Sequence, residues 1–212
     1  MKNLLKIIFL FLLFKSTNTN AQLPKITGGN SNYQDSYFKA YQYLKCNYDF
    51  TIAYYVTGGW SAADVINIQA LVLKDKSWKK ILLQIPKKNK EPSAEPKVKI
   101  ASFNGKKALQ LVDDLTAIGF WSIDNDSLNI KEIKPKIPSE NFINKDTVVI
   151  VADRTRRFSV VDGSSYHFVI IKNNELKIYR CDNPESYLGF FPEINATAVF
   201  VKAKTLFEKT MK

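Results

Sequence analysis

Side chains that could do covalent or acid–base chemistry gather in one stretch of the sequence, residues 160–187 (VVDGSSYHFVIIKNNELKIYRCDNPESY). This stretch holds His167, the single histidine of the chain, Cys181, one of its two cysteines, and the adjacent Ser164 and Ser165. A serine nucleophile needs a histidine base in hydrogen-bond contact and a third group that orients the imidazole. A cysteine nucleophile would need the same histidine. Because there is one histidine, a histidine-rich metal site is excluded, and the sequence predicts no metal ligands and no cofactor.

The pattern of this stretch predicts a β-hairpin. Asn173 and Asn174 stand between two β-type runs, and asparagine tolerates the positive φ that a two-residue type I′ turn requires. A turn at this place sets His167 opposite Arg180. Because successive side chains of a strand point to opposite faces, Cys181 is then expected on the face away from His167.

This register disfavours a nucleophilic active site. Ser165 shares a strand face with His167, but such i, i+2 neighbours point in parallel about 6 to 7 Å apart. The sequence before Ser164 is Asp-Gly, which does not resemble the G-x-S-x-G elbow of serine hydrolases. A thiol–histidine pair would have to use Cys46. Pairs of aspartates could still act as in glycosidases, but no aspartate stands in a context that singles it out. We therefore expect no catalytic residue.

Three of the four arginines form a basic cluster, Arg154, Arg156 and Arg157. Guanidinium groups present fixed forks of donors to carboxylate, sulfate or phosphate, so this cluster could clamp an anion; the alternative is a charged turn between strands. His167 and Arg180 form a second polar group at the end of the hairpin. These five residues are the candidate binding residues, and an anionic envelope component or a protein is the expected partner.

The first residues, MKNLLKIIFLFLLFK, predict a signal peptide over residues 1–21 that is cleaved after Ala21. The apolar run contains Lys6 and is shorter than the about 18 residues that a membrane span needs. We therefore expect a periplasmic or secreted protein with no stable membrane span after cleavage. In that oxidising compartment Cys46 and Cys181 could form a disulfide, or each could remain a separate buried thiol.

The net charge of +11 comes almost entirely from lysine. Such a charge is typical of a solvated surface, and it would also attract an anionic partner such as a polysaccharide, a lipid headgroup or an acidic protein. Nucleic acid is not expected as a partner, because the chain is expected to be exported and has no recognisable nucleic-acid-binding motif.

Residues 22–212 are expected to form a single α+β domain with a mobile N-terminus over residues 22–35. Alternating apolar residues from Phe50 onward, followed by β-type runs at 65–73 and 78–85, predict a three-stranded meander. With the hairpin, this gives an antiparallel sheet of about five to seven strands. Residues 86–99, which are rich in proline and lysine, predict a loop.

Two helices, near residues 105–118 and 195–210, are expected to pack on the sheet. Apolar residues of the first fall on one side of a helix, and Gly119 is placed to end it. Phe120 and Trp121 follow at once, and two large aromatic residues at this place are expected to pin the helix to the sheet. A short helix is also predicted around residues 37–44.

Three short motifs occur in a fixed order: Gly-Phe-Trp at residues 119–121, Asp-Gly at 162–163 and Asn-Pro-Glu at 183–185. Over residues 104–190 this order resembles a broad group of small, uncharacterised exported bacterial domains. The resemblance implies one α+β domain in the cell envelope of a Gram-negative bacterium, and it brings no catalytic residues with it. The expected function is non-catalytic binding; the alternatives are an envelope hydrolase that uses carboxylates or Ser164 with His167, and a toxin-immunity or inhibitor protein.

Overall fold

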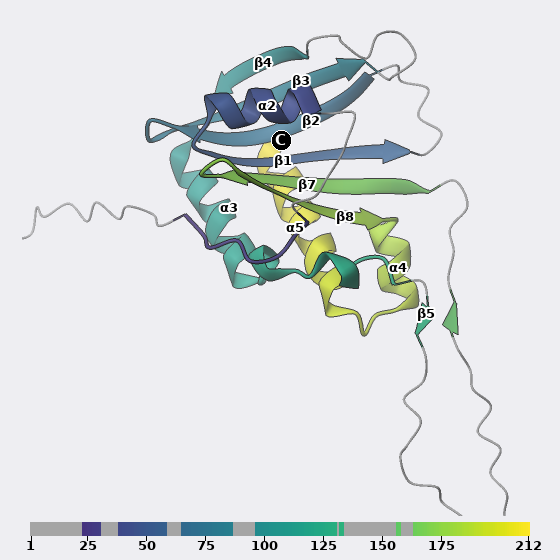
Figure 1. Ribbon diagram of the computed structural model, residues 1–212. Helices are drawn as coiled ribbons and strands as arrows, with labels where there is room; N and C mark the ends of the chain where they lie inside the picture. The colour runs from purple at the N-terminus through teal and green to yellow at the C-terminus, as the bar shows by residue number, and fades with distance from the viewer. Residues whose placement is uncertain are drawn as a thin grey trace, which may run out of the picture.

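The computed structural model describes residues 23–30, 38–58, 65–86, 96–130, 132–133, 156–157 and 163–212. These residues form a six-stranded antiparallel sheet in the order β4-β3-β2-β1-β7-β8 (Figure 1). Its strands are β1 (Phe50–Gly58), β2 (Val65–Lys74), β3 (Ser77–Pro86), β4 (Lys97–Ser102), β7 (Ser164–Lys172) and β8 (Glu175–Asp182). A separate ribbon pairs β5 (Glu132–Ile133) with β6 (Arg156–Arg157). The predicted α+β class with an antiparallel sheet is confirmed.

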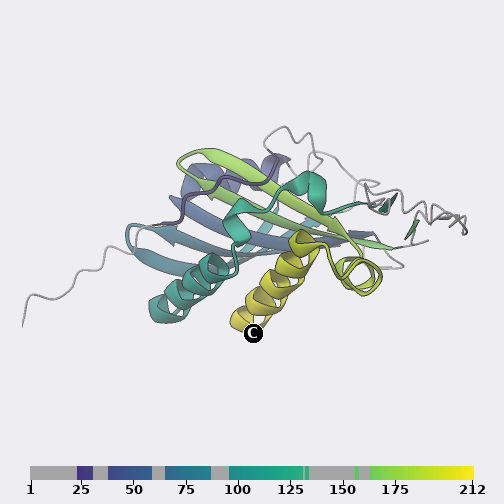
Figure 2. The same ribbon diagram turned by 90° about the horizontal axis from the view of Figure 1, so that it is seen from below.

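Helices lie on both faces of the sheet (Figures 1 and 2). One face carries α2 (Phe38–Asn47), and the other carries α3 (Gly105–Ala117) and α5 (Asn195–Met211). Shorter elements are η1 (Phe120–Ser122), η2 (Asn125–Ser127) and α4 (Pro184–Phe190). The helices expected near 105–118, 195–210 and 37–44 are thus confirmed. In the described ranges, none of the helices combines the length and the apolar character that crossing a membrane requires.

Alternation along β1 explains why both faces are covered. Phe50, Ile52 and Tyr54 belong to the core under α3 and α5, whereas Ala53 and Tyr55 belong to the core under α2. Successive side chains of a strand point to opposite faces, so a central strand that places apolar side chains on both faces needs a layer on each side.

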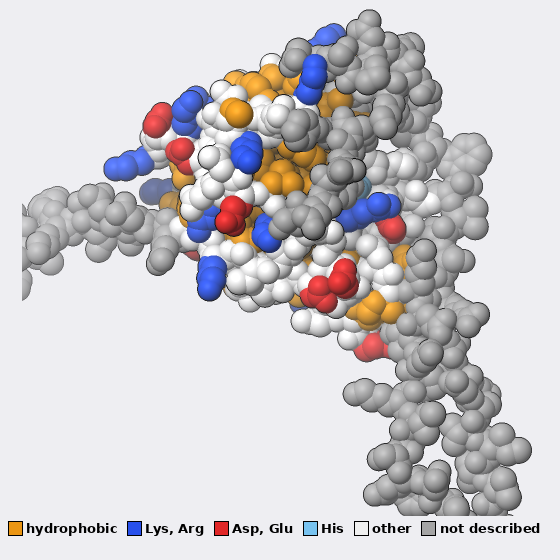
Figure 3. Space-filling view, in the orientation of Figure 1, with side chains coloured by type: hydrophobic (Ala, Val, Ile, Leu, Met, Phe, Trp, Pro, Cys, Tyr) orange, Lys and Arg blue, Asp and Glu red, His pale blue; other side chains and the backbone are white. Residues whose placement is uncertain are grey.

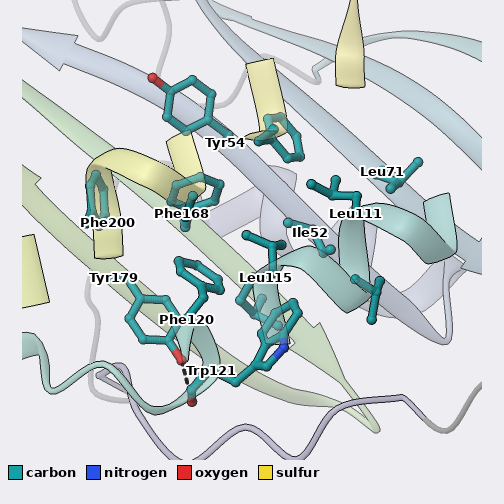
Figure 4. Close-up of a cluster of buried hydrophobic side chains, with 14 of the residues drawn as sticks. Ile52, Tyr54, Leu71, Leu111, Leu115, Phe120, Trp121, Phe168, Tyr179 and Phe200 are labelled. Atoms are coloured by element: carbon teal, nitrogen blue, oxygen red, sulfur yellow. Dashed lines mark hydrogen bonds between the residues drawn. The ribbon is translucent and has the colours of Figure 1, made fainter. Parts of the chain in front are cut away.

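The larger core lies on the side of α3 and α5 and is rich in aromatic rings (Figure 4). Gly119 takes a left-handed conformation with φ of 76° and ends α3, as predicted. Phe120 and Trp121 are buried directly after it, and the Tyr179 hydroxyl of β8 donates a hydrogen bond of 3.1 Å to the carbonyl of Trp121. This bond fastens the end of α3 to the sheet, as the Gly-Phe-Trp sequence led us to expect.

The N-terminal segment was expected to be mobile, but its residues 23–30 form hydrogen bonds with the sheet. The Lys172 side chain donates hydrogen bonds to the carbonyls of Leu23 and Pro24, at 3.1 and 2.8 Å. Asn30 exchanges two backbone hydrogen bonds with Ile178 of β8, at 2.9 and 3.0 Å. Leu23 and Ile26 also pack against the larger core, so apolar contacts as well as hydrogen bonds hold this segment on the fold.

Both ends of the loop predicted over residues 86–99 belong to strands. Pro86 is the last residue of β3, and Lys97 is the first residue of β4. Lysine is acceptable in β4 because an edge strand has one side in solvent. Residues 87–95 and the predicted signal peptide lie outside the described residues.

The Asn-Pro-Glu motif ends β8 and begins α4, a helix that the sequence did not predict. Asn183 has a left-handed conformation with φ of 44°, and Pro184 occupies the first position of α4. Proline is favoured at this position because its missing N–H would have no partner there and its φ already suits a helix.

Candidate binding surface

The hairpin of β7 and β8 has the predicted register. His167 pairs with Arg180, and the turn residues Asn173 and Asn174 have positive φ values of 50° and 66°. On its other side β7 pairs with β1, which sets Tyr55 directly opposite His167. One row of side chains therefore crosses three strands at this end of the sheet.

His167 is buried within this row, with an exposed fraction of 2%. Its ring stacks on Tyr55 with the centroids 4.5 Å apart, and its Nε2 shares a hydrogen bond of 3.0 Å with Thr57 Oγ1. The Tyr55 hydroxyl lies 2.6 Å from the Tyr41 hydroxyl and so links the row to α2. Burial, and then the charge of Arg180, lower the pKa of His167 to about 4. The imidazole is therefore neutral at pH 7 and acts as part of the core.

Neither Ser164 nor Ser165 is placed to act as a nucleophile with His167 as its base. Ser164 lies on the opposite face of β7 from His167, and its N–H donates a hydrogen bond of 2.8 Å to Asn183 Oδ1. Ser165 is on the same face as His167, but its hydroxyl donates to the Asp182 carboxylate and accepts a bond of 3.2 Å from Arg180. The pairing of Ser164 with His167 in the hydrolase alternative does not form.

Arg180 is the exposed member of the row formed by Tyr55, His167 and Arg180, with 46% of its side chain exposed. Its guanidinium forms an ion pair of 3.1 Å with Asp182, and its backbone N–H donates to Asn125 Oδ1. Two of the five candidate binding residues, His167 and Arg180, are thus neighbours, and both contribute to the structure of the hairpin.

The basic cluster is only partly described. Arg154 lies outside the described residues, whereas Arg156 and Arg157 form β6 opposite Ile133 and Glu132. Their backbone belongs to a strand, so these two residues are not the charged turn that was considered as an alternative. The prediction that the cluster clamps an anion stays a prediction.

Both cysteines are free thiols in the structure. Cys46 is exposed on α2, and Cys181 is buried in the core on the other side of the sheet. Burial, and then the charges of Asp182 and Glu185, raise the pKa of the Cys181 thiol to about 12. The disulfide that the sequence left open is therefore not formed, because the sheet separates the two thiols. Among the described residues, no group of histidine, cysteine and carboxylate side chains could hold a metal ion.

The edge strand β4 is a surface that the sequence interpretation missed, because the predicted loop included its first half, residues 97–99. Lys97 and Lys99 lie opposite Gln84 and Leu82 on the α3 side, and Val98 and Ile100 lie on the α2 side. Ile100 has an exposed fraction of 52%, and hydrophobic side chains gather along this rim (Figure 3). The signal was present in the sequence as the alternation Lys-Val-Lys-Ile, which has the period of a strand.

The surroundings of β4 are strongly basic. Residues 77–86 and 96–112, which cover β3, β4 and most of α3, contain no aspartate or glutamate. The same ranges contain six lysines: Lys79, Lys80, Lys97, Lys99, Lys106 and Lys107. The last four of these are exposed, and the Lys80 ammonium donates to the carbonyl of Met211. Three acids follow or precede these ranges directly: Glu95 before β4, and Asp113 and Asp114 in the second half of α3. Lysines that outnumber the neighbouring acids produce a positive potential that attracts anionic groups.

Comparisons with known proteins do not assign the chain to a family. No family model matches the sequence, and a search of curated proteins finds no significant match. The resemblance to small exported bacterial domains therefore stays a prediction, and the geometry of the described residues carries the functional argument.

Proposed function

We propose that this chain is an exported domain that acts by binding, in the periplasm or outside the cell, and that it has no catalytic activity of its own. Three side chains suited to nucleophilic or acid–base chemistry take part in the fold. His167 is buried and neutral, the buried Cys181 thiol is protonated at neutral pH, and Ser165 is bonded to Asp182 and Arg180. An active nucleophile would need a lowered pKa or an adjacent base.

The observation that carries the proposal is the basic surface around β4. Lys97, Lys99, Lys106 and Lys107 face solvent in a part of the chain where lysines outnumber acids. An unbalanced group of exposed lysines supports attraction to an anionic envelope component or to an acidic protein. This attraction depends on charge, so it weakens as salt screens it over about 10 Å at 0.1 M ionic strength.

Retention of the mature chain on an isolated cell-envelope fraction, measured as salt is increased, tests the proposal. We expect retention at low salt and about tenfold weaker retention when Lys97, Lys99, Lys106 and Lys107 are replaced by glutamine. The matched control replaces four exposed lysines outside this surface: Lys45, Lys74, Lys202 and Lys209. Equal losses in both variants would show that total charge, and not this surface, is responsible.

Two further measurements bear on the same proposal. The mass of the exported chain is expected to correspond to cleavage after Ala21, and an intact N-terminus would contradict the predicted export. Envelope material incubated with the chain is expected to release no fragments. Release that persists after removal of contaminating enzymes would show catalysis and would overturn the binding function.

A further inference from the structure

The two edge strands of the sheet, β8 and β4, differ in whether other residues bond to their outward backbone groups. The outer edge of β8 is covered, since Ile178 exchanges two backbone hydrogen bonds with Asn30. Further along, the Asn129 side chain accepts from the Asp182 N–H and donates to the Arg180 carbonyl, both at 2.9 Å. Asn125 accepts from the Arg180 N–H at 3.0 Å. Side chains and a short N-terminal segment thus satisfy the backbone groups that an edge strand would otherwise expose.

The other edge, β4, presents its backbone groups outward. The Phe103 N–H donates a bond of 3.1 Å to the carbonyl of Trp78, which lies opposite it in the continued register of β3 and β4. Bonded and non-bonded pairs alternate along an antiparallel ladder. It follows that Val98, Ile100 and Ser102 direct their N–H and C=O groups away from β3. No described residue forms a hydrogen bond with this outward row.

The side chains of β4 define which strand would fit there. A strand paired to this edge would place alternate residues beside Lys97 and Lys99 on the α3 side, and the intervening residues beside Val98 and Ile100 on the α2 side. Acidic residues suit the first set and apolar residues suit the second. In residues 77–86 and 95–117 six lysines stand against three acids, so the net charge of these ranges is positive.

We propose that the β4 edge binds an extended segment of a partner protein in which acidic and apolar residues alternate, and that this segment becomes a seventh strand of the sheet. This inference rests on the proposed binding function and names the class of partner. A second copy of the chain is the poorer occupant. Antiparallel pairing of two β4 strands would bring Lys97 and Lys99 of both copies onto one face, and each chain carries a net charge of +11.

The direct test measures binding of a capped peptide of the same length as β4, with alternating glutamate and valine, to the mature chain by fluorescence anisotropy. We expect saturable binding that weakens with salt. A peptide with lysine in place of glutamate is expected to bind at least about tenfold more weakly. A glutamate–valine peptide that is N-methylated on the backbone nitrogens facing β4 keeps its charge but loses its donors, so it should not pair.

Ile100→Pro separates strand pairing from simple charge attraction. The N–H of residue 100 points outward, so proline removes no bond to β3 and is tolerated at an edge position, but it blocks pairing with a new strand. We expect about a tenfold or greater loss of peptide binding in Ile100→Pro, and less than about a threefold change in the matched variant Ile100→Thr. Circular dichroism and thermal unfolding verify that both variants fold.

Charge reversal supplies an independent variant. The variant Lys97→Glu combined with Lys99→Glu is expected to lose binding of the acidic peptide and to gain binding of the lysine–valine peptide. The control Lys45→Glu with Lys202→Glu should change the binding of neither peptide.

Equal binding of the N-methylated peptide, or unchanged peptide binding by Ile100→Pro, would overturn strand pairing. A concentration-dependent dimer that Ile100→Pro abolishes would show that a second copy is the occupant and would overturn the proposed partner. If the chain is retained on envelope material but does not bind the peptide, this inference alone is refuted. If it is neither retained on envelope material nor binds the peptide, the proposed binding function is refuted as well.

Discussion

His167 shows how burial determines what a single residue can do. Its ring is stacked on Tyr55 and bonded to Thr57, and Arg180 lies beside it, so the neutral imidazole is favoured. A general base must reach its substrate and must have a pKa near the working pH. A buried imidazole with a pKa of about 4 meets neither requirement, and its contribution is to hold β1 and β7 together.

This environment predicts a specific dependence of stability on pH. The folded pKa of His167, about 4, lies below the unfolded value of 6.5, so the unfolded chain binds more protons between these two values. Stability is therefore complete above pH 6.5 and is lost as the pH falls toward 4. Between pH 7 and pH 5 we expect His167 to remove about 2 kcal/mol from the free energy of unfolding.

Urea denaturation of the wild type and of His167→Phe at these two pH values measures the effect. Phenylalanine keeps the stack on Tyr55 but cannot take up a proton, so the loss between pH 7 and pH 5 should be smaller by about 2 kcal/mol in the variant. Thr57→Val, which removes the hydrogen bond to the ring and leaves the histidine, should retain most of the loss. An identical pH dependence in His167→Phe would show that other groups cause it.

Gly163 is required by the side chain of Asn183. A Cβ at residue 163 would lie 1.9 Å from Asn183 Nδ2 and 2.4 Å from Oδ1, and that Oδ1 is fixed by the N–H of Ser164. Gly163→Ala should therefore lower the free energy of unfolding by about 1–3 kcal/mol. Asn183→Gly removes the obstacle and suits the left-handed backbone at that position. In a double-mutant cycle the two changes should cost clearly less together than their sum, whereas additive effects would contradict the steric explanation.

Among the elements, β8 is an edge strand that depends on loop side chains for its protection. Asn129→Ala removes two hydrogen bonds to the backbone of Arg180 and Asp182 and should destabilise the fold by about 1–2 kcal/mol. Amide hydrogen exchange at Asp182 should accelerate, and Asn125→Ala, which removes one bond to Arg180, should have the smaller effect. Unchanged exchange at Asp182 would show that this edge needs no such cover.

Elements with a strong internal pattern could be predicted from the sequence. The alternation of β1, the helical spacing of α3 with Gly119 at its end, and the Asn173-Asn174 turn each depend on neighbouring residues, and the structure confirms them. The turn also determined the pairing of His167 with Arg180. Local patterns of this kind carry their own geometry, since a period of two or of 3.6 already defines a face.

Elements fixed by distant partners could not be predicted in this way. Residues 23–30 form no regular element and are held by Lys172 and Ile178, which are far away in the sequence. The residues before β4 are rich in proline and lysine in sequence. The strand β4 forms because the backbone groups on the outer side of β3 pair with it. For the candidate site, the sequence named His167 and Arg180 as neighbours but overlooked Lys97 and Lys99, because an edge becomes visible only when the strand order is known.

For the molecule as a whole, the sheet divides the interior into two separate cores, and this determines the chemistry of the two thiols. Cys46 is exposed on α2, on one side, and Cys181 is buried on the other side with its Sγ–H directed at the carbonyl of Leu128, 3.4 Å away. A disulfide requires the two Cα atoms to approach within about 7 Å. Bridging these cysteines would therefore require the layers to be rearranged, even in an oxidising compartment.

Labelling of the folded chain with iodoacetamide, without reductant and followed by mass spectrometry, tests this arrangement. The thiolate is the reactive form, and a pKa of about 12 together with burial keeps Cys181 unreactive near pH 8, whereas Cys46 is accessible. We expect one label on the native chain, located at Cys46, and two labels after unfolding in denaturant. Cys46→Ser should show none when native and one when unfolded. If neither cysteine of the wild type reacts until a reductant is added, a disulfide joins the two, and the separation of the cores by the sheet is wrong.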